Sequence, residues 1–211
     1  MKKLISVLIL FLLTVTALIA EMELSTGGGV FYDGNFGSGA EGKTLGIPWS
    51  KAEQNNSFGA YIFFDAVFAE ASISFSSGTV TGQHIVNSTE MSSWKDHYMQ
   101  IGFTLLAKYP IGIGNITLFP LAGINYNCVI SATDKSGSNY SDPANRFSQF
   151  GIMGGAGIDC HINRNLYLRA EGMFQFRFPS ERWKSEADGI LNSNTTPGAG
   201  FVIRIGTGYC F

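Results

Sequence analysis

The chain ends with the stretch Phe201-Val-Ile-Arg-Ile-Gly-Thr-Gly-Tyr-Cys-Phe211, whose residues alternate in character. A β-strand directs successive side chains to opposite faces. One face of this strand is apolar or aromatic with a single threonine, and its members are Phe201, Ile203, Ile205, Thr207, Tyr209 and Phe211. The other face carries Arg204 among glycines. This pattern suits a strand with lipid on one side and a polar lumen on the other.

Seven earlier segments also carry an apolar face without a charged residue, so we predict eight strands. They span residues 23–36, 57–65, 68–77, 94–109, 115–130, 148–162, 166–178 and 199–211. Pro120 lies within the fifth segment and cannot donate to a strand ladder, so we expect a β-bulge there.

The connections between these segments alternate in length. Three are tight turns, at residues 65–67, 110–114 and 163–165. Four are long and polar, at residues 37–56, 78–93, 131–146 and 179–196. An up-and-down meander places all the short turns at one end and all the long loops at the other, which is the arrangement of bacterial outer-membrane barrels.

Composition excludes several classes of protein. Only 14% of the 211 residues are charged, against about a quarter in soluble domains. The net charge is −2, from 14 basic and 16 acidic residues, so no basic excess points to nucleic acid. Cys128, Cys160 and Cys210 have no metal-ligand spacing, and we expect unpaired thiols, no metal and no cofactor.

The N-terminus has the features of a signal peptide. Lys2 and Lys3 precede an apolar run from Leu4 to Ala20, and polar sequence begins at Glu21. We therefore predict a signal peptide over residues 1–20, cleaved after Ala20, and a barrel domain over residues 21–211. The rest of the chain has no other apolar run long enough to cross a bilayer as a helix.

A secreted lipocalin-like barrel would also alternate, with its apolar face inward, but two features favour lipid outside. The polar faces are weakly charged for a solvated exterior, and their charged members are Asp33, Asp65, Glu70, Lys108, Asp159, Arg169, Glu171, Arg177 and Arg204. Aromatic residues gather near the predicted strand ends, with Phe58, Trp94, Phe150, Phe178 and Phe201 at the loop end and Phe64, Tyr109, Tyr209 and Phe211 at the turn end. Two such girdles are expected where a barrel meets both interfaces. A closed barrel also satisfies every backbone group without water.

With these features the chain resembles the small eight-stranded outer-membrane barrels, such as the OmpA transmembrane domain, OmpX and OmpW. The resemblance implies an all-β fold, an eight-stranded antiparallel up-and-down transmembrane β-barrel. It also implies that Ile203, Ile205, Tyr209 and Phe211 form the C-terminal signal read by the barrel-assembly machinery. The expected partners are then outer-membrane lipid and, during biogenesis, that machinery and periplasmic chaperones.

The predicted interior is too narrow for wide porin traffic, because side chains fill an eight-stranded barrel. Isolated buried charges are costly, so the interior charges must pair. We expect one network of Glu70, Lys108, Arg169, Glu171, Arg177 and Arg204. Such a network either stiffens the barrel as a plug or rearranges as a gate for small ions or solutes.

Three functions remain open at this stage. The first is a structural barrel or a narrow conduit for small solutes. The second is a surface adhesin or ligand-binding protein, because long loops on a rigid scaffold are where binding concentrates. The third, remote, is a lipid-modifying enzyme, for which His97 near Ser92, Ser93 and Asp96 is a weak grouping. We expect no enzyme.

Overall fold

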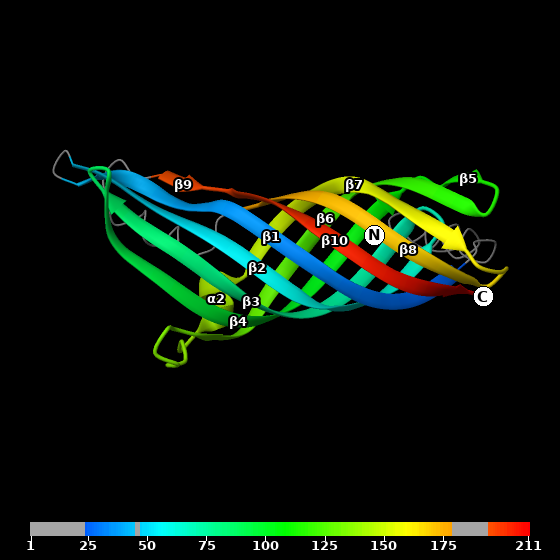
Figure 1. Ribbon diagram of the computed structural model, residues 1–211, viewed down its shortest axis with the longest axis horizontal. Helices are drawn as coiled ribbons and strands as arrows, with labels where there is room; N and C mark the ends of the chain where they lie inside the picture. Colours follow the sequence, from blue (N-terminus) through cyan, green and yellow to red (C-terminus); the bar gives the residue numbers. More distant parts are fainter. Residues whose placement is uncertain (1–23, 45–46, 179–193) are drawn as a thin grey trace, which may run out of the picture.

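The computed structural model describes residues 24–44, 47–178 and 194–211, which lie almost entirely in antiparallel β-strands (Figure 1). The elements are β1 Leu24–Thr44, β2 Ile47–Ala66, β3 Ala69–Val86, β4 Thr89–Lys108, β5 Ile111–Ile113, β6 Ile116–Thr133, α2 Pro143–Phe147, β7 Gln149–His161, β8 Leu166–Arg177, β9 Asn194–Thr196 and β10 Gly198–Cys210. The predicted signal peptide, residues 1–20, lies outside the described residues.

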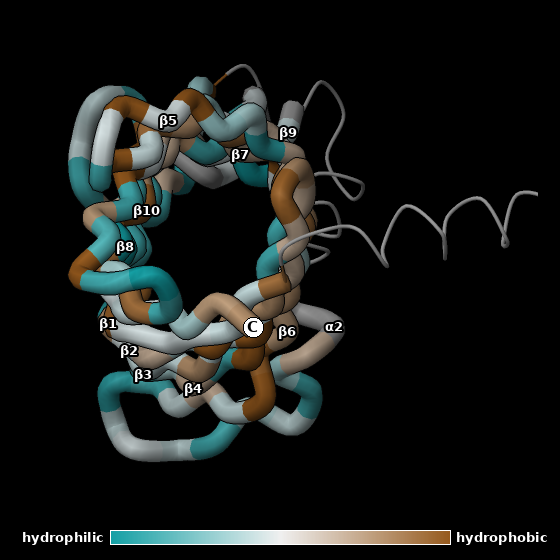
Figure 2. The backbone as a smooth tube through the Cα atoms, turned by 90° about the vertical axis from the view of Figure 1, so that its right-hand side faces the viewer, coloured by the Kyte–Doolittle hydropathy of each residue, from teal (hydrophilic) through white to brown (hydrophobic). Residues whose placement is uncertain are grey.

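Eight long strands pair in the order β1, β2, β3, β4, β6, β7, β8 and β10, each antiparallel to the next. β1 also pairs with β10, from Ser25 opposite Cys210 to Phe36 opposite Ala199. This last pairing joins the two ends of the sheet, and Figure 2 shows the strands arranged as a ring. The predicted eight-stranded up-and-down barrel is confirmed.

The apolar faces point outward, as predicted. Phe103, Ile152 and Ile203 are each close to half exposed, and Phe174 is 80% exposed. On the alternating positions Arg169 and Arg204 are buried. The outer face of β10 is apolar or aromatic at most positions from Phe201 to Phe211, about 33 Å of strand. At a tilt near 45° that length covers about 23 Å, close to the height of the apolar band of an outer-membrane barrel.

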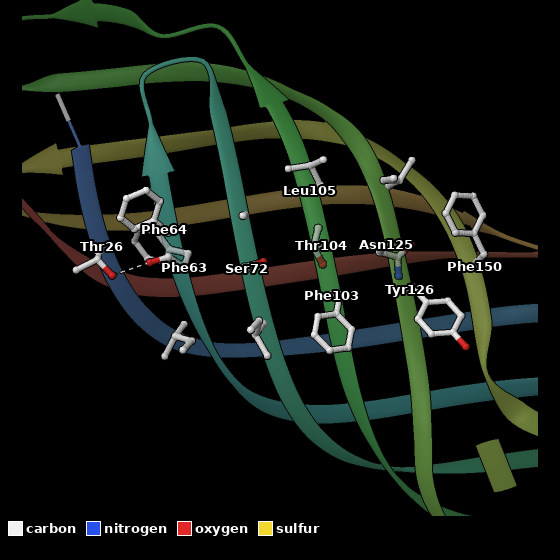
Figure 3. Close-up of a pocket in the computed structure, with 14 residues that line it drawn as sticks. Thr26, Phe63, Phe64, Ser72, Phe103, Thr104, Leu105, Asn125, Tyr126 and Phe150 are labelled. Carbon is white, nitrogen blue, oxygen red and sulfur yellow. Dashed lines mark hydrogen bonds between the residues drawn. The ribbon is translucent and has the colours of Figure 1, made fainter. Parts of the chain in front are cut away.

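A shallow apolar groove crosses this outer wall on β2, β3, β4, β6 and β7 (Figure 3). Its volume is about 500 Å³, and large outward side chains such as Phe64, Phe103 and Phe150 surround the small Ala71. Acyl chains contact apolar side chains of this kind on the wall of any membrane barrel. The groove is therefore part of the lipid-facing wall.

Two of the predicted long loops are strands instead. Most of residues 37–56 belongs to β1 and β2, and most of residues 78–93 belongs to β3 and β4. At the left of Figure 1 these hairpins extend well beyond the barrel body. Asn87 and Ser88 join β3 to β4 with φ of 48° and 65°, the two positive values that a type I′ turn requires. These segments escaped prediction because they lack the continuous apolar face of a lipid-facing strand.

The other connections differ in smaller ways. The predicted turn at residues 110–114 contains β5, which pairs with β6. Residues 131–146 include the end of β6 and most of α2. Of residues 179–196, only β9 is described, and it pairs with β1.

The β-bulge expected at Pro120 is absent. The β6–β7 register runs through Pro120 opposite Ala156 without a shift. The Pro120 carbonyl accepts from the Tyr109 amide at 3.4 Å, so the proline nitrogen faces the same neighbour. The neighbouring strand is interrupted there, because β4 ends at Lys108 and β5 begins at Ile111. The nitrogen of Pro120, which has no hydrogen to donate, therefore faces a gap in the strand ladder.

The aromatic residues near the strand ends lie outward with one exception. Phe58, Phe150 and Phe178 are exposed at the loop end, and Phe64, Tyr109, Tyr209 and Phe211 at the turn end. Phe201 is 37% exposed and packs near Tyr32, with their ring centroids 5.7 Å apart. Trp94 instead packs with the buried Ala40 and Trp49 inside the extended hairpins, since it shares strand parity with the buried Asp96 and Tyr98.

Large aromatic rings fill the half of the interior nearest the short turns, and glycines make room for them. Phe63 lies opposite Gly27, Phe119 opposite Gly157, and Tyr167 opposite Gly208. A Cβ atom at any of these glycines would collide with its partner's ring. The rings therefore lie flat across the glycines of the neighbouring strands.

Replacing Gly157 with valine should destabilise the barrel by about 1–3 kcal/mol, because the buried Phe119 ring must move. Gly172→Val is the matched control, since a Cβ at Gly172 meets nothing within 4 Å. Urea unfolding, followed by the mobility of unboiled protein on a gel, measures both. Equal unfolding midpoints for the two variants would contradict the packing described here.

Candidate functional site

An ion-pair cluster crosses the lumen in the half of the barrel nearest the short turns. It contains four carboxylates and three cations: Asp65 on β2, Glu70 on β3, Lys108 on β4, Asp159 on β7, Arg169 and Glu171 on β8, and Arg204 on β10. Every one of these side chains is at least nine-tenths buried. Inward strand positions place them there, because alternate residues of each strand face the lumen.

Arg169 is the centre of the cluster. Its guanidinium donates to both carboxylate oxygens of Asp159, at 2.8 and 2.7 Å, and to Asp65 at 2.5 Å. Its Nη1 also donates to Glu70 Oε2 at 2.6 Å. Asp65 is shared with Lys108, which forms a second ion pair with it. One arginine on β8 thus ties together β2, β3 and β7.

Arg204 makes a second connection across the lumen. Its Nη1 lies 3.3 Å from both Glu70 Oε1 and Ser72 Oγ on β3, and its Nη2 donates to Thr104 on β4 at 3.1 Å. Three long strands separate β8 from β3, and β10 from β4, along either direction of the ring. Both arginines therefore span the diameter of the barrel.

Glu171 contacts both arginines without a hydrogen bond to either. Its carboxylate oxygens lie 3.6 Å from Arg204 Nη1 and 3.9 Å from Arg169 Nη1. Neither oxygen has a hydrogen-bond partner within the described chain. Both arginines contact Glu70, and Glu171 is a second carboxylate that lies near both of them.

Aromatic rings surround the cations. The Arg169 guanidinium carbon lies 4.6 Å from the Phe63 ring centroid and 5.1 Å from those of Phe119 and Tyr167. Arg204 lies 5.1 Å from the Tyr61 ring centroid. Cation–π contact at these distances adds attraction and excludes water from the ion pairs. The cross-section at this level is filled by rings and ions.

The structure brings together five of the six residues expected to form one network. Arg177 lies apart, nearer the extracellular end, where it and Gln175 both donate to Asp33. It lies eight positions along β8 from Arg169, about 26 Å of strand. The sequence places Asp33, Asp65 and Asp159 on polar faces, but their roles as partners follow only from strand register. Asp159 lies directly opposite Arg169.

The lumen above the ion-pair cluster is lined by amides. The buried amide side chains are Asn35, Asn55, Gln100, Asn125, Asn127, Gln149 and Gln175. Several of their atoms, including both of the Asn35 amide, have no hydrogen-bond partner within the described chain. A cavity of about 20 Å³ between Tyr98, Gln149 and Arg177 has room for about one water molecule. This half of the lumen is polar but narrow.

The grouping around His97 is not brought together. His97 is exposed on the outer face, whereas Asp96 is buried on the inner face, where Tyr140 Oη donates to it at 3.1 Å. Ser92 is paired with His84 on β3. Among the residues that the structure describes, no group of three histidine, cysteine or acidic side chains could hold a metal. Cys128, Cys160 and Cys210 form no disulfide within the part of the chain that the structure describes.

The C-terminal residues share the outer face of β10. Ile203, Ile205, Tyr209 and Phe211 are all exposed there, and Phe211 is 74% exposed. The Tyr209 and Phe211 rings meet edge to face at 5.6 Å between centroids. The backbone amide of Phe211 donates to the Leu24 carbonyl at 3.0 Å, which extends the β1–β10 seam to the last residue.

No helix within the described ranges is long and apolar enough to cross a membrane. An apolar outer wall, aromatic girdles and an enclosed polar interior define a transmembrane β-barrel. The chain belongs to the outer membrane protein beta-barrel domain family, whose family model matches residues 5–174. It is an outer-membrane protein.

Solved outer-membrane barrels are similar in fold. OprG from Pseudomonas aeruginosa is 15% identical with a TM-score of 0.48, over 90% of this chain and 96% of that one. Neisserial surface protein A is 12% identical with a TM-score of 0.43, over 87% and 99%. The attachment invasion locus protein Ail of Yersinia pestis is 12% identical with a TM-score of 0.41, over 90% and 100%. No curated protein matches the chain.

Replacing Arg169 with methionine should destabilise the barrel by about 3–5 kcal/mol, because three carboxylates lose their main cation while still buried. Arg164→Met, on the exposed turn between β7 and β8, should change stability by less than about 0.5 kcal/mol. Urea unfolding in detergent micelles compares the two. Similar midpoints would mean that the cluster contributes little to folding.

Proposed function

We propose that the protein is a structural outer-membrane barrel with a closed lumen, which holds a rigid extracellular sheet above the membrane. The observation that carries this proposal is the contact of Arg169 on β8 with Glu70 on the opposite strand β3. A barrel bridged across its diameter at this level leaves no continuous path for a hydrated solute.

The energetic argument supports a closed resting state. Opening a path would separate Arg169 from Asp65, Glu70 and Asp159, whose side chains are all at least nine-tenths buried. Breaking a buried pair costs about 3–5 kcal/mol when one partner is left uncompensated. The aromatic rings around Arg169 would have to move as well.

The extended hairpins support a role for the extracellular side. A strand needs about 9–11 residues to cross the membrane, whereas β1, β2 and β4 have 20 or 21. About half of each strand therefore projects outward, and β9 adds to the edge of the sheet along β1. A ligand from outside would meet this sheet first.

Planar-bilayer recordings test the closed lumen. Wild-type protein should give no discrete conductance steps, and Arg169→Ala with Arg204→Ala should give small steps, because both connections across the diameter are then removed. Arg164→Ala, at the exposed turn, should stay silent. Steady single-channel steps from wild type at low voltage would reject the closed resting state.

A gated conduit for small solutes is the second candidate, and the position of Glu171 favours it. Its oxygens lie within 4 Å of both arginines that now contact Glu70, so the arginines have an alternative partner. The same recordings separate the candidates: a gate gives brief wild-type openings that Glu171→Gln reduces. Openings unaffected by Glu171→Gln would argue against this switch.

We further propose export through a cleaved signal peptide and recognition of the C-terminal strand during assembly, helped by periplasmic chaperones. Phe211→Ala should slow assembly, because it removes the exposed terminal ring while leaving the β1–β10 hydrogen bonds in place. The fraction of heat-modifiable protein in outer membranes measures this. Phe174→Ala, an equally exposed ring on β8, serves as the control. If both variants assembled equally well, the proposal that Phe211 is part of an assembly signal would be rejected.

A further inference from the structure

The outer face of the extracellular sheet carries a groove of about 580 Å³ across β1 to β4. Phe36, Gln54, Thr81 and Lys95 form one row across it, since each is the register partner of the next. Ala52, Gln83 and Ser93 form the next row, and Lys135, from the segment after β6, also lines the groove. The side chains in both rows are exposed.

The groove presents two positive charges to the outside. Lys95 and Lys135 are both exposed. Glu53 is the one carboxylate among its described lining residues, and its side chain is buried on the inner face of β2. Asp134, next to Lys135, turns its Oδ1 toward its own loop, where it accepts from the Ser136 amide and hydroxyl and the Ser138 amide at 2.6–2.9 Å.

The hydrogen bond from the Ser136 hydroxyl, with those of the loop amides, holds the pKa of Asp134 below its ordinary value. Its charge is therefore engaged within the loop. Lys95 and Lys135 are left as the charged groups that face a ligand in the groove, together with the amides of Gln54 and Gln83 and the hydroxyls of Thr81 and Ser93.

The height of the groove relative to the membrane identifies what lies beside it. Phe58 is the last large apolar side chain on the outer face of β2, and Gln54 lies four residues beyond it, about 13 Å of strand. With the strand tilt this is about 10 Å above the edge of the apolar band, the level of lipid headgroups. Below it, β2, β3 and β4 carry the apolar wall of Figure 3.

We propose that this groove binds the phosphorylated sugar headgroup of an outer-leaflet glycolipid, whose acyl chains lie against the apolar wall of the same strands. Lysine ammonium groups bind phosphate as point charges. Amides and hydroxyls offer donors and acceptors to sugar hydroxyls. Continuity with the acyl-facing wall favours a lipid over a soluble anionic glycan. The proposal holds whether or not the lumen conducts.

Native mass spectrometry of the folded full-length protein in detergent tests this with three probes. These are an acylated glucosamine disaccharide with two phosphates, the same lipid without phosphates, and the phosphorylated disaccharide without acyl chains. Wild type should bind the first most tightly. Lys95→Gln and Lys135→Gln should each weaken it roughly fivefold, as expected for one basic residue at an anionic membrane surface. Arg164→Gln, with the same charge change at the periplasmic turn, should have no effect.

Each other outcome overturns the proposal. Absence of binding, or equal binding of the first two probes, would show that phosphate is not recognised. Wild-type affinity in both lysine variants would place recognition elsewhere. Equal binding of the third probe would identify a site for soluble glycans. Unboiled gel mobility confirms that the variants fold, so a lost site is distinguished from a lost barrel.

Discussion

The structure depends on the pairing of Arg169 with carboxylates from three other strands. A narrow barrel in lipid encloses every inward side chain, so a charged group placed there is not solvated by bulk water. Arg169 is long enough to reach Glu70 across the lumen, and its planar group offers several donors at once. The inward positions of β2, β3 and β7 that it reaches must therefore carry acceptors, and they carry Asp65, Glu70 and Asp159.

The glycines on the inward faces follow from the same constraint. Cations in this interior are surrounded by rings, and these rings lie opposite a glycine on one neighbouring strand. Phe119, which contacts both Lys108 and Arg169, lies opposite Gly157. Tyr167, which also contacts Arg169, lies opposite Gly208. Ion pairs, rings and glycines thus form one packed unit, whose parts depend on one another.

The outward pattern could be predicted from sequence because lipid imposes one local rule on every strand. The expected segments at 166–178 and 199–211 agree with β8 and β10 to within about one residue. The interior could not be derived in this way, because the pairing of Arg169 with Glu70 joins residues 99 positions apart and depends on the register of the whole ring. The extended hairpins lack the lipid signal altogether. The error over Trp94 could have been avoided from the sequence, because Trp94 lies two residues from Asp96 and therefore on the same, inward face of the strand.

The two ends of the barrel lie far apart along the strands, which bears on how its properties can vary. Thr104 contacts Arg204 on the inner face of β4, whereas Lys95 lies nine residues away on the outer face, about 30 Å of strand. A wall one residue thick separates the inner and outer faces, and the ion pairs on the inside are shielded from the surface by aromatic rings. Charges on the extracellular sheet can therefore change without disturbing the ions that close the lumen. A closed periplasmic half fixes the scaffold, and the polar hairpins above it remain free to differ in what they contact.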